Sequence, residues 1–199
     1  MSRFEPLPRE FYQRSALQLA RLCIGQLLVS ELHGELLVSR IVEAEAYAGV
    51  RDSACHGFGG RRTARNESMF GPPGHAYVFL IYGLHFHLNL VAAKESDPSA
   101  VLLRAVEPIV GEAPMRARRR YPKDRRIVTN GPGKLCQAYG IDRSVDGIDL
   151  CHPPLYLAQG TRPRHIGRSP RIGIDYAGDW AQKPYRFFDA SSSFVSSMR

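Results

Sequence analysis

The chain has few of the patterns that would indicate a disulfide framework, a structural zinc site or a membrane span. Its 199 residues include four cysteines, at positions 23, 55, 136 and 151, with no CxxC pair. This spacing favours reduced thiols over disulfides or a zinc knuckle. No apolar run reaches the roughly 18 residues of a membrane-spanning helix, and residues 1–8 carry charge where a secretory signal needs an apolar stretch. We therefore expect a soluble intracellular protein with no membrane partner.

Lysine is also scarce, with four lysines against 23 arginines, although the formal net charge is +8 and the sequence pI is near 9.6. Residues 61–65, 116–126 and 162–171 carry net charges of +3, +6 and +4, so the rest of the chain sums to −5. A local excess of this kind is typical of a surface that binds a polyanion, and arginine binds phosphate with a forked geometry. The alternative is a solvated, arginine-rich surface, since GC-rich coding also favours arginine.

Hydrophobic periodicity predicts short helices and strands in irregular order. Residues 15–23 place apolar side chains on one helical face before Gly25, and helices are also expected over 113–120 and over 134–139, where Gly140 would end the helix. Strands are expected over 27–32 and 36–46, joined through His33-Gly34, and over a second hairpin at 76–91 with Tyr82-Gly83 at its turn. Further strands are expected over 101–106, ended by Pro108, over 155–158 and over 171–174.

These elements show no regular βαβ alternation, no internal repeat and no low-complexity linker. The pattern favours an α+β fold, a single compact domain with a mixed, mostly antiparallel sheet, hairpins and surrounding helices. We expect one domain over residues 1–199, with ragged ends at about 1–7 and 198–199.

An unusual pair of carboxylates lies within one expected strand. Glu43 and Glu45 share a strand face because side chains alternate with a period of two, and carboxylates are poor strand formers. Tyr47, His56 and a loop rich in glycine and arginine follow within about 20 positions. The arrangement is typical of a functional site, although a glutamate on an exposed strand face often only solvates it.

The second hairpin supplies a set of aromatic side chains. Tyr77 and Phe79 share a strand face, and Tyr82 beside Gly83 would lie near the tip, where a large ring has little to pack against. An aromatic ring at a turn beside basic loops can stack on bases or insert between them. The alternative, that the rings fill the core, suits Tyr77 and Phe86 better than it suits Tyr82.

His85 and His87 form an HxH pattern on the same hairpin. Together with His56 or His75 they could indicate a metal site. No Asp, Glu or Cys lies in register to complete the ligand set, so structural histidines are the better interpretation.

Several motifs in order closely resemble the alkyladenine (3-methyladenine) DNA glycosylase family. They are RIVEAEAY (40–47), His56, RN (65–66), MF (69–70), PG (73–74), the YV and IYG pieces of the hairpin (77–78 and 81–83), VLLRAVEP (101–108) and GPGKLCQA (131–138). The similarity continues through PRIGI (170–174), YAGDW (176–180), KP (183–184) and RF (186–187). The resemblance covers roughly residues 8–197, nearly the whole chain.

The resemblance implies an α+β domain without metal or cofactor that flips a damaged purine nucleotide out of duplex DNA. The enzyme would hydrolyse the N-glycosidic bond and leave an abasic site. By resemblance, Glu45 is the general base, Arg104 and the backbone at Ile172 place the attacking water, and Tyr82 is the intercalating residue. The base pocket would comprise Tyr47, His56, Phe79 and Asn89, with Asn89 excluding guanine. The better-known members of the family carry tyrosine where this chain has Phe79.

The remaining expectations concern DNA contacts and reaction type. Candidates for binding the DNA backbone are Arg61, Arg62, Arg65, Lys134 and Arg171. None of the lysines, at 94, 123, 134 and 183, lies beside the Glu45 motif, which indicates a monofunctional enzyme without lyase activity. We expect a monomer that acts on double-stranded chromosomal DNA containing damaged purines, in a bacterial cytoplasm or a eukaryotic nucleus. The alternatives are a noncatalytic nucleic-acid-binding module and a metal-dependent hydrolase built on His85 and His87.

Overall fold

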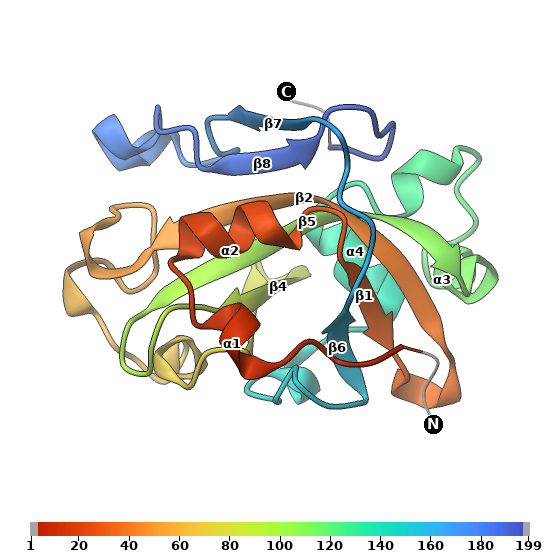
Figure 1. Cartoon of the computed structure of the whole chain (residues 1–199), viewed down its shortest axis with the longest axis horizontal. Coiled ribbons are helices and arrows are strands. Elements are labelled where there is room, and N and C mark those ends of the chain that lie inside the picture. Colours follow the sequence, from red (N-terminus) through yellow and green to blue (C-terminus); the bar gives the residue numbers. More distant parts are fainter. Residues whose placement is uncertain (1–3, 197–199) are drawn as a thin grey trace.

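Two long antiparallel strands, β2 (Leu37–Ala48) and β5 (Ser99–Val110), form the centre of the sheet. The computed structural model describes residues 4–196, and all strand pairs among them are antiparallel. The strand order is β3-β4-β5-β2-β1-β6, and the β7–β8 pair joins β2 through β8 (Figure 1). The other strands are β1 (Leu27–Ser30), β3 (Ala76–Ile81), β4 (His85–Val91), β6 (Leu155–Ala158), β7 (Ile166–Ser169) and β8 (Arg186–Asp189).

Local capping signals mark the start of α2 and both ends of α4. Ser15 and Gln18 form a capping box at the start of α2 (Ala16–Cys23). Pro132 opens α4 (Pro132–Tyr139), and Gly140, with φ +67°, ends it in the left-handed conformation. The other helices are α1 (Arg9–Tyr12) and α3 (Glu112–Arg118). Short 3₁₀ segments are η1 (Leu32–Gly34), η2 (Gly49–Arg51), η3 (Phe58–Gly60), η4 (Glu67–Phe70), η5 (Arg125–Val128), η6 (Arg143–Val145) and η7 (Asp175–Trp180).

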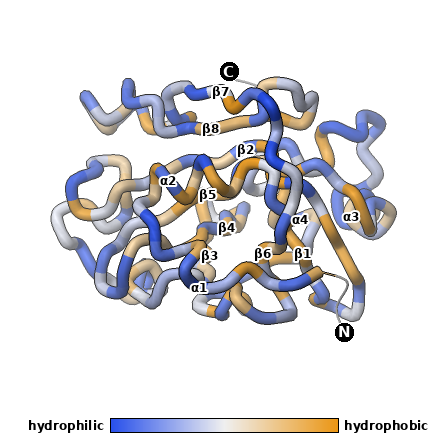
Figure 2. Tube along the Cα trace, in the orientation of Figure 1, coloured by the Kyte–Doolittle hydropathy of each residue, from blue (hydrophilic) through white to orange (hydrophobic). Residues whose placement is uncertain are grey.

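The main core lies between the sheet and helices α2 and α4. Leu19 and Cys23 of α2, and Leu135 and Tyr139 of α4, belong to one buried cluster with the central strands. Figure 2 shows hydrophobic residues along these strands and hydrophilic residues over much of the peripheral loops. No helix within residues 4–196 is long and apolar enough to cross a membrane.

The α+β class, the three predicted helices and both predicted hairpins are confirmed, but two strand predictions are wrong. The strand expected to end before Pro108 continues to Val110, because Pro108 pairs with Ser39 beside a register irregularity that tolerates a proline. Residues 171–174 form a loop, and the neighbouring strand is instead β7.

Ragged ends are predicted at about 1–7 and 198–199. Of these residues, 1–3 and 198–199 lie outside the described range. Within that range, Pro6 forms a bridge to Ala158, and the Leu7 N–H donates to the Leu157 carbonyl at 2.7 Å. Residues 6 and 7 are therefore paired with β6.

Candidate active site

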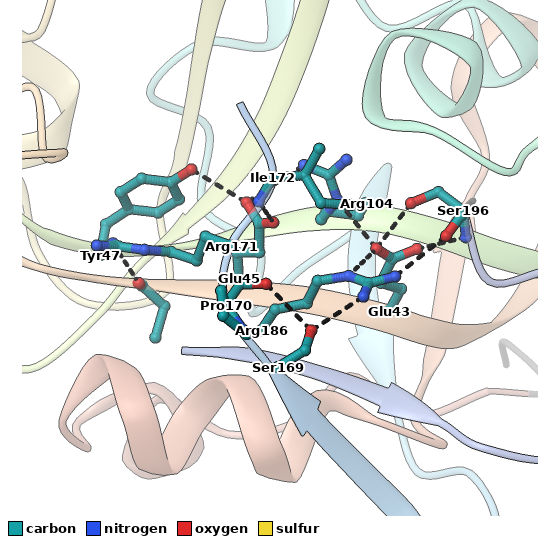
Figure 3. A network of polar contacts seen from close by, with 11 residues as sticks. Glu43, Glu45, Tyr47, Arg104, Ser169, Pro170, Arg171, Ile172, Arg186 and Ser196 are labelled. Carbon is teal, nitrogen blue, oxygen red and sulfur yellow. Dashed lines mark hydrogen bonds and ion pairs between the residues drawn. The ribbon is translucent and has the colours of Figure 1, made fainter. Parts of the chain in front are cut away.

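A double irregularity in the β2–β5 pairing sets the position of the two carboxylates. Ile41 pairs with Val106 and Glu43 pairs with Ala105, but Ala44 pairs with Leu103, so Val42 and Arg104 are extra residues on opposite strands. A bulge re-aims side chains, and because the two extra residues lie on opposite strands, the register is the same on both sides of the irregularity. As a result Ile41 and Ala44 both join the main core, while Glu43 and Glu45 lie on the other face of β2, where Glu43 contacts Arg186 and Glu45 contacts the Ile172 N–H (Figure 3).

Glu45 is fully buried and is held by three groups. Its Oε1 accepts the Ile172 N–H at 2.8 Å, and its Oε2 accepts the Tyr47 hydroxyl at 3.1 Å and lies 3.2 Å from Arg104 Nη1. Burial raises the pKa of Glu45, and the positive charge of Arg104 opposes this increase. Glu45 is therefore a carboxylate of increased basicity, which is the property that a general base needs.

Arg104 lies between the two carboxylates (Figure 3). Its Nε donates to Glu43 Oε1 at 3.0 Å while Nη1 contacts Glu45. Burial alone would lower the pKa of Arg104, but Glu45 and Glu43 reverse this effect and raise it. The guanidinium thus stays charged inside the site.

A cavity of about 100 Å³ lies against this group, and aromatic rings form much of its wall. The His56 ring centroid is 4.5 Å from that of Phe79, and His56 Nδ1 is 2.7 Å from the Tyr77 hydroxyl. The predicted site residues on its wall are Tyr47, His56, Phe79, Asn89, Arg104 and Ile172. Glu45 lies directly behind this wall, bonded to Tyr47, Arg104 and Ile172. The structure therefore brings together all of the predicted pocket and catalytic residues.

Asn89 lies in the cavity wall on β4. Its Nδ2 donates to the Tyr77 carbonyl at 3.1 Å across the β3–β4 pair, which fixes the orientation of the amide. The side chain thus satisfies a backbone group and also faces the cavity.

Arg171 has a different position from the one that a DNA contact requires. Its guanidinium binds the Asp52 carboxylate through both Nη atoms, at 2.5 and 2.8 Å, and lies 4.6 Å from the centroid of the Tyr47 ring. The side chain is 0% exposed. This position argues against the prediction that Arg171 binds a DNA phosphate. The side chain instead fixes Tyr47 and holds the loop that presents the Ile172 N–H.

The other predicted DNA-contact residues are exposed or half-exposed, and two of them lie next to the cavity. Tyr82 is 85% exposed at the tip of the β3–β4 hairpin. Arg61 and Arg65 line a cleft of about 330 Å³ that shares His56 and Tyr176 with the base cavity. Arg62 forms an ion pair with Glu67, and Lys134, in the first turn of α4, donates to Asn130 Oδ1 at 2.9 Å.

Among the wall residues that sequence reasoning did not assign to the site, His87 and Tyr176 carry polar groups and aromatic rings. His87 drew attention only as part of the HxH pattern. Burial, together with the charge of Arg104, lowers the pKa of His87 to about 4, so the ring is neutral near pH 7. Among residues 4–196, no group of three or more His, Cys, Asp or Glu side chains is placed to hold a metal ion.

Comparison with known proteins agrees with this geometry. Residues 10–193 match the sequence profile of the methylpurine-DNA glycosylases. The chain belongs to the methylpurine-DNA glycosylase family. As a member of this family it is a DNA repair enzyme of the base-excision type, which acts on DNA and hydrolyses an N-glycosidic bond.

Three relatives of this glycosylase match nearly its whole length. A protein of Methanocella arvoryzae is 49% identical, with 96% of this chain and 95% of the relative covered. Proteins of Myxococcus xanthus, 47% identical with 96% and 93% covered, and Desulfitobacterium hafniense, 45% identical with 96% and 98% covered, are also similar. All three carry the provisional name 3-methyladenine DNA glycosylase.

Proposed function

We propose that this glycosylase flips alkylated or deaminated purines, 3-methyladenine among them, out of duplex DNA and releases the base with water as the nucleophile. The observation that carries the proposal is the position of Glu45, a buried carboxylate behind an aromatic cavity, held by Arg104, the Tyr47 hydroxyl and the Ile172 N–H. The provisional names of the relatives support the same substrate class.

Glu45 acts as the general base in this proposal. It takes a proton from water as the water oxygen bonds to C1′, and the C1′–N bond breaks with its electron pair going to the base. The negative carboxylate also faces the positive charge that develops on the sugar. An N3- or N7-alkylated purine leaves as a neutral base and needs no acid. Hypoxanthine, which is neutral in DNA, depends more on hydrogen bonds from the cavity.

The cavity selects the base by fit. Tyr47 and Phe79 supply rings on which a cationic purine can stack, and stacking does not need the hydroxyl that Phe79 lacks. The fixed amide of Asn89 excludes the exocyclic amine of guanine, because an amide held by the Tyr77 carbonyl cannot turn away to make room for the added group. Tyr82 fills the gap left in the stack, and unstacking costs a few kcal/mol.

Duplex oligonucleotides that each carry one lesion test this function. The protein is incubated with each duplex in the presence of EDTA, and abasic products are then cleaved with alkali. We expect strand cleavage only after alkali, with 3-methyladenine among the substrates, and no cleavage at a normal guanine. Trapping of a covalent DNA adduct with borohydride would contradict monofunctional action.

Glu45→Gln is the decisive variant, because it keeps the shape of the side chain and removes its basicity. We expect loss of base release of at least about a hundredfold, with affinity for the lesion duplex within about threefold of the wild type. Undiminished base release by this variant would remove Glu45 from the reaction.

Analytical ultracentrifugation of the complex would show whether a monomer acts.

A further inference from the structure

Glu43 is a second buried carboxylate beside the site, and the mechanism above does not use it. Its Oε1 accepts from Arg104 Nε at 3.0 Å, Arg186 Nε at 2.6 Å and the Ser196 hydroxyl at 2.8 Å. Its Oε2 accepts the Ser196 N–H at 2.7 Å. Glu43 is 0% exposed. Its carboxylate lies between the guanidinium groups of Arg104 and Arg186 and the backbone at Ser196 (Figure 3).

Fold stability alone gives a weak reason for such a cluster. Removing charged groups from water costs several kcal/mol each, and apolar side chains of similar volume often replace a buried ion pair without loss of stability. Packing does not explain one feature of the cluster, namely that it includes Arg104, which also contacts Glu45. Arg104 uses its Nε for Glu43 and its Nη1 for Glu45.

The two contacts fix the plane of the Arg104 guanidinium. With Nε bonded to Glu43, Arg104 approaches Glu45 through one nitrogen at 3.2 Å. Without Glu43, the guanidinium could turn and bind Glu45 with two parallel hydrogen bonds, the geometry that arginine and carboxylate favour. A carboxylate bound in that way is a weaker base and has less lone-pair capacity for water.

We propose that Glu43 is a positioning residue that keeps Arg104 from pairing fully with Glu45, and that Arg186 and Ser196 hold Glu43 for this purpose. This inference rests on the proposed role of Glu45 as the general base. It makes β8 and residues 190–196 part of the active site, because Arg186 also donates to the Ser196 carbonyl at 3.1 Å and to Ser169 Oγ at 3.0 Å.

Charged and titratable groups approach Glu45 from each element that packs on it. Arg104 comes from β5, Arg186 from the paired position on β8, and Glu43 and Tyr47 from β2 itself. The loop before η7 adds Arg171 together with the Ile172 N–H. Among these groups, the negative charge of Glu43 raises the pKa of Glu45 and the charge of Arg104 lowers it. Loss of the Glu43 charge therefore lowers the pKa of Glu45 in two ways. It removes the repulsion by Glu43, and it lets Arg104 pair more fully with Glu45.

Glu43→Gln tests the proposal by single-turnover base release from a 3-methyladenine duplex across a pH series. We expect the rate at neutral pH to fall about tenfold or more, because small misplacements of catalytic groups are costly. We expect affinity for the duplex to stay within about twofold. The acid limb of the pH profile should move to lower pH. A rate within twofold of the wild type with an unmoved acid limb would overturn the proposal.

Two further variants separate positioning from folding. Glu107→Gln removes a carboxylate of β5 that pairs with Arg40 outside this cluster, and should keep the wild-type rate and pH profile. Ser196→Ala removes one hydrogen bond to Glu43 without removing a charge, and should lower the rate about threefold with unchanged affinity. If Glu43→Gln does not fold, as judged by circular dichroism, a wild-type rate for Ser196→Ala overturns the proposal.

The wild-type protein and Glu45→Gln are measured in the same experiment, so that failure of the proposed function can be told from failure of the proposed role of Glu43. If the wild type releases no base, the proposed function fails. If the wild type is active and Glu45→Gln is not, while Glu43→Gln behaves as the wild type, only the role of Glu43 fails.

Discussion

Glu43 and Glu45 have the same side chain and lie two positions apart, yet their surroundings differ. Glu43 is bound by two guanidinium groups and Ser196, whereas Glu45 shares one guanidinium and borders the cavity wall. The sequence singled out both residues through their unusual strand. It could not separate them without the resemblance, because Arg186 and Ser196 lie 143 and 153 residues from Glu43 along the chain.

His87 is a second residue whose surroundings could not be predicted from the sequence. The HxH pattern suggested a metal ligand or a structural role, and it gave no sign that the ring of His87 lies in the cavity wall. The ring centroid of His87 lies 5.3 Å from that of Phe79, and the two ring nitrogens make no hydrogen bond to residues 4–196. Its imidazole is therefore available to a base in the cavity.

Replacing His87 should affect neutral bases more than cationic ones. We expect His87→Phe to lower hypoxanthine release about fivefold to tenfold, the value of one hydrogen bond, and to change 3-methyladenine release by less than about twofold. Single-turnover rates on the two lesion duplexes measure the difference. His85→Phe is the matched control, because His85 lies on the same strand outside the cavity wall. Equal losses on both lesions would contradict recognition by His87.

At the scale of elements, the sequence predicted hairpins and helices well because their signals are local. Alternating apolar residues, His33-Gly34 and Tyr82-Gly83 turns, and the Gly140 cap each act within a few positions. The double irregularity at Val42 and Arg104 has no such signal, since it arises from pairing between β2 and β5. Arg171 was misjudged for a related reason. Its partner Asp52 lies 119 residues earlier in the chain.

The β3–β4 hairpin carries a conformational cost at its tip. Tyr82 has φ +51° and Gly83 has φ +67°, and the Leu84 N–H donates to the Ile81 carbonyl at 3.1 Å. A left-handed conformation costs a non-glycine residue roughly 1–2 kcal/mol, and a side chain that is 85% exposed gains little from packing. Strain of this kind is typical of functional positions.

Tyr82→Gly separates this strain from the function of the ring. We expect the free energy of unfolding to stay within about 1 kcal/mol of the wild type, because relief of strain offsets the added flexibility of glycine. Base release from duplex DNA should fall at least about tenfold, since no ring remains to fill the stack. Tyr121→Gly is the matched control, as Tyr121 is also exposed with φ +51°. Thermal unfolding and single-turnover release measure the two effects. Full activity of Tyr82→Gly would exclude a wedge role.

At the scale of the whole molecule, the arginine-rich segments that give the net charge of +8 differ in what their side chains contact. In the segment 116–126 many arginines have internal partners, such as Arg116 and Arg125 with Glu112 and Arg126 with Asp124. In the segment 61–65, Arg61 and Arg65 line the cleft next to the base cavity. The largest local charge in the sequence is therefore not the one nearest the site, and only the folded chain shows this.

The salt dependence of DNA binding follows from this distribution. Each phosphate neutralised adds about 0.9 to the magnitude of the log–log slope of affinity against salt concentration. We expect Arg61→Gln to reduce that magnitude by about 1 and to weaken binding to damaged and undamaged duplexes alike. Arg126→Gln should leave the slope unchanged, because the guanidinium it removes already binds Asp124. Fluorescence anisotropy titrations at several salt concentrations measure both slopes. A larger change for Arg126→Gln than for Arg61→Gln would place the DNA backbone over the segment 116–126 instead.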